Sequence, residues 1–595
     1  MASFFRKCIA QKLAPFLLGS NKNEVGDIIS SVSSFVKVDK YKSKETKLVL
    51  SWKKLCDSFI FKDNDLEPSK VVRLLRNQGL PTAEGFIDIE LNESRNPALV
   101  FTVDEHVFSK FVLMDISNTE NLVQNSCLFE NISQKKVLVA CSSSAIGDLF
   151  SMTHFRSAIR SKFVLNINRF IGHEALHIRH IADFGLGAAI FLAGHKEFSL
   201  HTDLSSDPSR ILEVGKAADQ KYNDDLHFQE KVENMLQKMF QGDQATLSDL
   251  NDVRSAWMQY YDLVYKKMGL SFDITHLDSN HIQEIKKIYE QIDLSEFLSV
   301  EEKKEAEAVG SADSCFHSGI SRRFLQHELS SYINAAVVNK EKHKFDAMYL
   351  IAPSSKKAFF KLFLQLLNKL GYSWSKEVKL LELRNIPSFD SKKMKGALEV
   401  LDLAKLKILD KLHYDLQLEI DENVDAMAEN LGFSSLCLND MKYRPNVQYN
   451  FLWKDVLTFG KHSAASLQFC YAGLKGLQED SEYKFKLDID TSPLLEGSAH
   501  DLIKHLSRFD EILYESYINL EPHKLYQYLC SLWFFTDRAS NVLRLDIKGD
   551  RLIVIKARLL LLSSTLKVLE AGLKLLGLTP MENKYSRTVN VQDKL

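Results

Sequence analysis

Apolar residues follow two different periods along this chain. In the first part, short apolar runs at 47–50, 85–89 and 98–102 have the length and alternation of β-strands. From about residue 386 onward, apolar residues recur at helical spacing, and Leu566, Leu569, Leu573 and Leu576 are predicted to line one face of a helix. The pattern therefore predicts an α/β region followed by a helical C-terminal region.

The stretch 135–187 has the most informative pattern. An apolar run at Val137–Ala140 predicts a strand, and after a loop a helix is predicted to open near His154 and Arg156. A second strand is predicted to end at Asp183. A β-loop-α-β unit of this kind begins a nucleotide-binding sheet.

At 595 residues the chain is too long for one compact domain, so we expect several. The sequence predicts the following parts: a small N-terminal α/β domain at 1–115, a Rossmann-like domain at 116–385 with an exposed helical insertion at about 212–308, a helical connective region at 386–455, a helical bundle at 456–581, and a polar, disordered tail at 582–595.

Composition narrows the class of protein. With 45% apolar and 26% charged residues, the chain reads as an ordinary globular protein. No apolar run reaches the roughly eighteen residues that a membrane span needs. A net charge of −2 gives no global sign of nucleic-acid binding, so any such contact must come from local patches. The 8 cysteines form no C-x-x-C pair, which argues against a zinc or disulfide framework and favours a reducing compartment.

One short motif resembles a metal site. The residues from His173 to His177 fit H-E-x-x-H, a zinc-binding pattern that requires a helix. Here Gly172 is expected to end the preceding helix, and 175–181 alternates like a strand. On a strand the two histidines lie about 13 Å apart, too far to share one ion. We therefore expect no metal site.

The N-terminal segment allows two interpretations. It contains Arg6, Lys7, Lys12 and Lys22 and has no acidic residue before Glu24. Its apolar residues have helical spacing, which is typical of a mitochondrial presequence. The same pattern is also typical of the first helix of a folded domain, and the two interpretations are compatible with each other.

The stretch 135–187 resembles the signature region of class I arginyl-tRNA synthetases, above all the mitochondrial branch. That family writes E-F-S-S-P-N-x-A-K-x-x-H-x-G-H-L-R-S, followed by L-G-H and G-D-W-G-x-Q. This chain keeps the following residues in register: Ser142, Ser143, His154, Arg156, Ser157, Gly172, His173, Asp183 and Gly185. The resemblance implies a catalytic role for His154, and substrate binding by Ser142, Ser143, Arg156 and Asp183.

The family's H-x-G-H motif is altered. In the family its two histidines donate hydrogen bonds to ATP phosphates, whereas here Ser151 and Thr153 replace the first histidine and the glycine. The branched Thr153 side chain stands where the family has no Cβ. Loss of one transition-state donor costs roughly 3–4 kcal/mol, so the resemblance implies adenylation slowed about a hundredfold.

The residues that the resemblance assigns to arginine recognition are also changed. The family's Glu and Asn become Ala140 and Ala145, and its Gln becomes Gly187, which leaves Asp183 as a partner. Each lost acceptor costs about 1–3 kcal/mol, because a bound guanidinium would remain partly unpaired.

Two further motifs depart from the family. The family's Y-x-T-R-D string corresponds to residues 328–332, which read E-L-S-S-Y, so Tyr332 stands in the place of the aspartate. The loop that matches K-M-S-K keeps its charge but not its order. The resemblance implies that three lysines of this loop have a catalytic role and contact pyrophosphate: Lys392, Lys393 and Lys395.

The C-terminal region resembles the family's anticodon-binding helical bundle, and 1–115 faintly resembles its tRNA-elbow domain. The segment 462–477 matches G-x-x-L-Q-Y-x-x-A-R, keeping Gln468 but with Gly473 in place of the arginine. The resemblance implies tRNA contacts by Gln468 and Arg558.

Three functions remain open. We favour a mitochondrial-matrix pseudo-synthetase that binds tRNA, of arginine type, or a protein partner, and has lost or weakened arginylation. The alternative is a divergent but active arginine–tRNA ligase, in which the substitutions reflect drift. The third is a protein-interaction subunit without RNA binding. We expect no permanently bound cofactor, and ATP with magnesium only if the enzyme is active.

Overall fold

The structure is a computed structural model. It describes residues 1–18, 25–39, 45–61, 67–80, 85–141, 146, 150–198, 208–292, 294, 322–384, 386, 396–481, 489–495, 497–545 and 551–581. The chain forms two compact units. The first comprises Met1–Ser133, Ile408–Lys442 and Leu457–Leu595, and the second comprises Gln134–Lys407 and Tyr443–Val456. The predicted connective region 386–455 is therefore divided between the two units.

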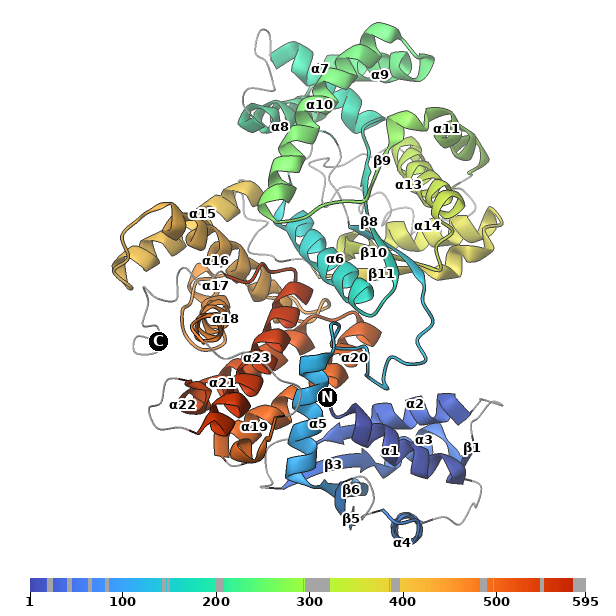
Figure 1. The fold of residues 1–595 in the computed structure, drawn as a ribbon. Coiled ribbons are helices and arrows are strands. Elements are labelled where there is room, and N and C mark those ends of the chain that lie inside the picture. Colours follow the sequence, from blue (N-terminus) through green and yellow to red (C-terminus); the bar gives the residue numbers. More distant parts are fainter. Residues whose placement is uncertain are drawn as a thin grey trace. The chain divides into compact units, whose positions relative to one another are not determined.

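A five-stranded parallel sheet forms the centre of the second unit (Figure 1). Its strands, in chain order, are β7 (Lys136–Cys141), β8 (Glu174–Ile181), β9 (Ile274–Leu277), β10 (Ala347–Pro353) and β11 (Val378–Leu383). The order across the sheet is β11-β10-β7-β8-β9, and every neighbouring pair is parallel. Strand β10, which lies between β11 and β7, is buried along its whole length, as expected for a strand covered on both faces. The predicted Rossmann-like sheet and its first two strands are confirmed.

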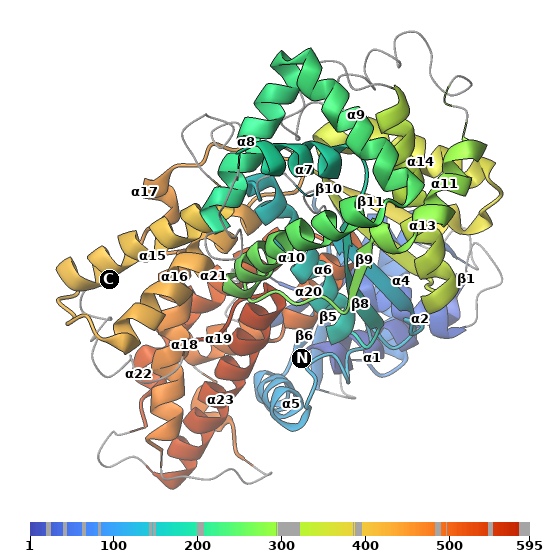
Figure 2. The same ribbon diagram turned by 90° about the horizontal axis from the view of Figure 1, so that it is seen from above.

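Helices cover both faces of this sheet (Figures 1 and 2). Helix α6 (Met152–Phe170) packs against β7, β8 and β10. Helices α13 (Arg322–His343) and α14 (Lys357–Lys369) contribute to an apolar core with β7, β8 and β10. The sheet is therefore held between two helical layers, as the α/β prediction requires.

The prediction of a helical insertion at about 212–308 is wrong at one place, because this segment also supplies a strand of the sheet. It contains the helices α8 (Pro208–Asp224), α9 (Leu226–Gln241), α10 (Gln244–Lys267) and α11 (Ile282–Gln291), but also β9, which completes the sheet. A strand of 4 residues between charged helices gives too short an alternating pattern to stand out. Helix α7 (Leu186–Phe198) precedes the insertion.

The N-terminal part of the first unit is a four-stranded antiparallel sheet with flanking helices. Its strands, in their order across the sheet, are β2 (Val36–Val38), β3 (Thr46–Ser51), β6 (Ala98–Val103) and β5 (Phe86–Asn92). A separate two-stranded antiparallel sheet is formed by β1 (Leu17–Leu18) and β4 (Ile60–Phe61). Its helices are α1 (Ser3–Leu13), α2 (Val25–Phe35), α3 (Trp52–Ser58), α4 (Pro68–Asn77) and α5 (Glu105–Asn118). The three predicted strands correspond to β3, β5 and β6 and are confirmed.

Helix α1 lies in the core of its unit. Phe5, Ile9 and Leu13 are buried, and the fully buried Arg6 pairs with the carboxylates of Asp510 and Glu511. The segment forms a helix of the folded unit, as the second interpretation predicts, while its interpretation as a presequence stays a prediction. A buried guanidinium with two carboxylate partners is an integral part of a core.

The remaining helices form the C-terminal bundle and the segment before it. They are α15 (Ala397–Tyr414), α16 (Glu422–Met441), α17 (Trp453–Val456), α18 (Ala464–Glu479), α19 (Gly497–Leu506), α20 (Phe509–Asn519), α21 (His523–Arg538), α22 (Ser540–Leu543) and α23 (Leu552–Leu575). The predicted apolar stripe on α23 and the residue after it is buried, which confirms it as core. Among the described residues, no helix is long and apolar enough to cross a membrane.

Candidate active site

The order of the strands places the candidate site at one edge of the parallel sheet. Strand β7 is central: the chain runs from it through β8 to β9 on one side, and β10 and β11 lie on the other. The strand order thus reverses between β7 and β10. Ligands of such sheets bind at the point where the order reverses, beyond the carboxyl ends of the strands. Here those ends are Cys141 of β7 and Pro353 of β10, which are neighbouring strands.

The N-terminus of α6 follows the loop after β7. Ser151 is the N-cap residue, and the backbone N–H of His154 donates to its Oγ over 3.4 Å. His154 Nδ1 in turn accepts from the Ser151 N–H at 3.2 Å and lies 3.0 Å from Ser151 Oγ. This capping box stabilises the first turn, and it directs one ring nitrogen of the predicted catalytic histidine into its own helix. Thr153 is the second residue of α6, in its first turn, and is half-buried.

Arg156 is buried on the same helix. Its guanidinium donates to the carbonyl oxygens of Arg384 and Pro445, and it lies 5.6 Å from the centre of the Tyr449 ring. These contacts join α6 to segments that follow the sheet, which is a structural role. Its predicted contact with substrate stays a prediction.

Asp183 is completely buried just beyond β8, and both of its carboxylate oxygens have partners within the chain. Oδ1 accepts from the Ser279 N–H at 2.9 Å, and Oδ2 accepts from Arg254 Nη1 at 3.1 Å and from the Ser279 hydroxyl. Arg254 also donates to Ser279 Oγ at 2.8 Å. In this structure Asp183 therefore anchors the end of β8 and is not a free carboxylate for a substrate guanidinium.

Gly185 follows Asp183 with a φ of +110°, and a Cβ here would lie 2.9 Å from His327 Cε1. A side chain is therefore excluded by both conformation and space. Gly187, which replaces the family's Gln, lies in the first turn of α7 and is half-buried.

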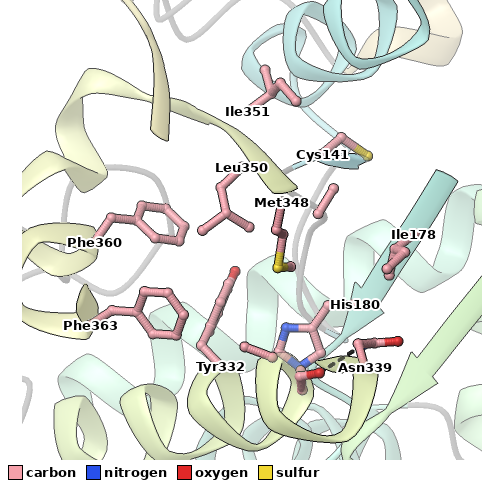
Figure 3. Close-up of a pocket in the computed structure, with 13 residues that line it drawn as sticks. Cys141, Ile178, His180, Tyr332, Asn339, Met348, Leu350, Ile351, Phe360 and Phe363 are labelled. Atoms are coloured by element: carbon pink, nitrogen blue, oxygen red, sulfur yellow. Dashed lines mark hydrogen bonds between the residues drawn. The ribbon is translucent and has the colours of Figure 1, made fainter. Parts of the chain in front are cut away.

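A small cavity lies between β7, β8 and β10 on one side and α13 and α14 on the other (Figure 3). Its volume of about 30 Å³ accommodates a water molecule or two, whereas ligand pockets span roughly 300–1,000 Å³. Ala140 and Tyr332 both line it, and its lining among the described residues includes no carboxylate. Burial raises the pKa of the Cys141 thiol at its edge to about 12, so this cysteine is a protonated, inert side chain.

Several predicted site residues lie outside the described residues. They are Ser142, Ser143 and Ala145 in the loop after β7, and Lys392, Lys393 and Lys395 in the lysine-rich loop. Their predicted roles stay predictions.

The H-E-x-x-H residues lie on and before a strand, as expected. His173 precedes β8 and accepts from the Lys135 N–H at 3.3 Å, whereas His177 lies on β8 with its Nε2 2.9 Å from Ser161 Oγ. The two histidines therefore have separate partners and do not form the helical zinc motif.

The two residues predicted to contact tRNA differ in accessibility. Gln468 is completely buried in the bundle, where its Nε2 donates to the Thr579 carbonyl at 3.0 Å and its Oε1 accepts from the Met581 N–H at 2.9 Å. It fixes the end of the bundle and is not available to tRNA in this structure. Arg558 on α23 is half-buried and donates to the Arg544 carbonyl at 3.2 Å.

Four polar residues near this edge of the sheet were not predicted from the sequence: Arg254, His276, Asp278 and Ser279. All four come from the segment predicted to be an exposed insertion. The β-branched, alternating run at 273–277 was the available signal, since it predicts a short strand that would bring its neighbours to the sheet.

Comparisons with known proteins agree with this architecture. The family model described as "tRNA synthetases class I (R), catalytic domain" matches residues 118–453, and the one described as "DALR anticodon binding domain" matches residues 467–583. The human probable mitochondrial arginine–tRNA ligase is 25% identical over 590 residues, covering 98% of this chain and 100% of the relative. The mitochondrial arginine–tRNA ligase of Saccharomyces cerevisiae is 23% identical, covering 76% of this chain and 72% of the relative.

Solved structures show the same fold over most of the chain. Arginyl-tRNA synthetase from Thermus thermophilus matches with a TM-score of 0.70 and 16% identity, covering 97% of this chain and 99% of that one. The enzyme from Plasmodium falciparum matches with a TM-score of 0.65 and 16% identity, covering 91% and 95%. Together with the catalytic-domain match over more than half of its length, the parallel sheet and the helical bundle show that this chain belongs to the class I arginyl-tRNA synthetase family.

Proposed function

We propose that this protein is a mitochondrial pseudo-synthetase that binds tRNA, or a protein partner, and has lost or weakened arginylation. The observation that carries the proposal is the small cavity between the sheet and the helices α13 and α14. Ala140 and Tyr332 occupy positions where the family resemblance implies carboxylates, and both line a small cavity whose described lining is mostly apolar. With a volume of about 30 Å³ the cavity has no room for a guanidinium, and its described lining offers no carboxylate to pair with one.

Asp183 supports the proposal from a second direction. It is the one acidic residue that the sequence left for the guanidinium, and it is already bound by Arg254 and Ser279. A substrate would have to displace an internal guanidinium to reach it. The Ser151–His154 capping box adds a third argument, because a serine there provides a shorter and uncharged donor than the family's first histidine.

The proposed partner and compartment rest on the relatives. The match to an anticodon-binding domain supports tRNA as the partner, and arginine-type mitochondrial tRNA is the first candidate. The names of the human and yeast relatives support a mitochondrial location, which we place in the matrix. ATP with magnesium would be bound only if some adenylation activity survives, with contacts from His154 and the lysine-rich loop.

The test is an ATP–pyrophosphate exchange and arginylation assay of the full chain with arginine and mitochondrial arginine tRNA. We expect no exchange above background. We also expect retention of the same tRNA in a filter-binding assay. His154→Ala should change tRNA binding by less than about twofold, since the proposed activity does not use the phosphate-contacting residue.

An active arginyl-tRNA synthetase of another source serves as the control, because it shows that the tRNA preparation accepts arginine. Exchange at ordinary synthetase rates that His154→Ala abolishes would replace the proposal with the divergent ligase. Absence of both exchange and tRNA binding would favour the protein-interaction subunit.

A further inference from the structure

Three metal-binding side chains meet at the β8–β9 edge of the parallel sheet. His180 of β8 and His276 of β9 are register partners, so they lie side by side on neighbouring parallel strands. Asp278 directly follows β9, two residues after His276, and begins a short 3-10 helix (Asp278–Asn280). One ligand atom from each of the three residues lies within 4.8 Å of the others.

The cluster is buried in the second unit. His276 is 5% exposed, Asp278 is 1% exposed, and His180 also lines the small cavity seen in Figure 3. His180 Nε2 lies 2.8 Å from Asp278 Oδ1. Ser331 of α13 donates to Asp278 Oδ2 at 2.6 Å and lies 3.0 Å from His180 Nε2. Its hydroxyl thus stands next to two of the three ligands.

His276 provides a second, independent observation. Its Nε2 is buried and has no hydrogen-bond partner, although buried polar groups are almost always paired. Its ring stacks on His281 with centroids 4.6 Å apart, a contact that satisfies no ring nitrogen. Because a ring nitrogen of His276 lies within 4.8 Å of a ligand atom of His180 and of one of Asp278, an ion bound among the three residues would give this imidazole a partner.

A hydrolytic Ser-His-Asp triad is not built from the same residues. Both Ser331 Oγ and Asp278 Oδ1 approach the same nitrogen, Nε2 of His180. A triad requires the acid and the serine to lie on opposite ring nitrogens. The arrangement is therefore one of convergent ligands and not of a proton relay.

We infer that His180, His276 and Asp278 form a binding site for a divalent transition metal, Zn²⁺, with Ser331 or a water in the fourth position. Two imidazoles and one carboxylate are a donor set that zinc accepts, and ligands of a tetrahedral ion lie roughly 3.4 Å apart. The site goes beyond the proposed tRNA-related function and does not depend on it.

The experiment uses the full-length protein, stripped with a chelator and reloaded with Zn²⁺ alone. Metal content is measured by mass spectrometry after gel filtration, and binding is measured by competition with a chromophoric chelator. We expect one zinc per chain. We also expect His276→Gln to weaken binding by roughly a hundredfold or more, since changes even to residues outside the ligand shell cost about 10- to 100-fold.

His173→Gln is the matched control, because His173 is a buried histidine next to the same strand but outside the cluster. It should bind zinc like the unmodified protein. Substitution of Co²⁺ gives a second readout that needs no variant: strong visible absorption without a sulfur charge-transfer band indicates tetrahedral nitrogen and oxygen ligands. Absence of stoichiometric zinc, equal binding by His276→Gln, or a thiolate band from one of the free cysteines would each overturn the inference.

Discussion

At the scale of single residues, burial decides what a histidine can do in this protein. His505 lies in the core of the helical bundle, where its ring stacks on Tyr528 with centroids 4.3 Å apart and its Nε2 lies 3.0 Å from the Tyr528 carbonyl oxygen. Burial lowers the pKa of His505 from 6.5 to about 3, even though the hydrogen bond to Tyr528 opposes the shift. The same residue type that was singled out for catalysis at His154 therefore serves packing here.

This pKa makes a prediction about acid stability. A histidine whose folded pKa lies below its unfolded pKa remains neutral in the fold while the unfolded chain takes up a proton, so stability falls as the pH drops from about 6.5 towards 3. In His505→Gln, which keeps a donor but cannot titrate, the loss of stability between about pH 7 and pH 5 should be smaller by about 2 kcal/mol. Hydrogen exchange of the α21 amides at both pH values measures it. An unchanged pH dependence would show that other groups carry the effect.

At the scale of elements, α1 shows how a segment with the pattern of a targeting sequence becomes part of a core. Arg6 donates two hydrogen bonds to Asp510, at 2.8 and 2.7 Å, and one to Glu511 at 2.9 Å, and Ser3 donates to Asp510 at 2.8 Å. These hydrogen bonds join α1 to the beginning of α20, and Arg6 and Asp510 are 504 residues apart in the chain. Removing one member of such a buried set leaves the other charges without compensation.

The prediction for this element compares two cations on the same helix. Arg6→Met should destabilise the first unit by about 3–5 kcal/mol, because Asp510 and Glu511 stay buried without their partner. Lys7→Met removes an exposed ion pair to Glu130 and should cost less than about 1 kcal/mol. Urea unfolding followed by circular dichroism measures both. Equal costs for the two variants would contradict the structural role of Arg6.

At the scale of the whole molecule, the net charge of −2 requires that tRNA binding come from local groups. Phosphate contacts release counterions, so affinity should fall steeply with salt even though the protein as a whole is not basic. The net charge gives no sign of such phosphate contacts, so the composition of the chain could not identify tRNA as the partner.

The corresponding prediction concerns the half-buried Arg558 of α23. If it contacts a tRNA phosphate, Arg558→Ala should reduce the slope of log affinity against log salt by about 1, and weaken binding similarly for different tRNAs. Gln468→Ala is the comparison, since this buried side chain should affect the stability of the bundle and leave the salt slope unchanged. Filter binding across a salt series measures both. An identical slope for Arg558→Ala would remove this residue from the interface.

The sequence alone predicted the parallel sheet, the first two of its strands, the helical bundle and the family, because each depends on local periodicity and on motifs contiguous in the chain. It also predicted that Ala140, where the family has Glu, leaves Asp183 as the remaining acidic partner for a guanidinium. It placed β9 in a helical insertion, because four strand residues carry little signal against long charged helices.

Only the tertiary structure decided which side chains have partners. The sequence predicted Asp183 as a substrate ligand. In the structure Arg254 and Ser279, 71 and 96 residues away, donate hydrogen bonds to its carboxylate. His180 and Asp278 are 98 residues apart and meet because β8 and β9 pair in one register. Local patterns report propensity and burial, whereas hydrogen bonds between distant segments depend on strand pairing that no local window contains.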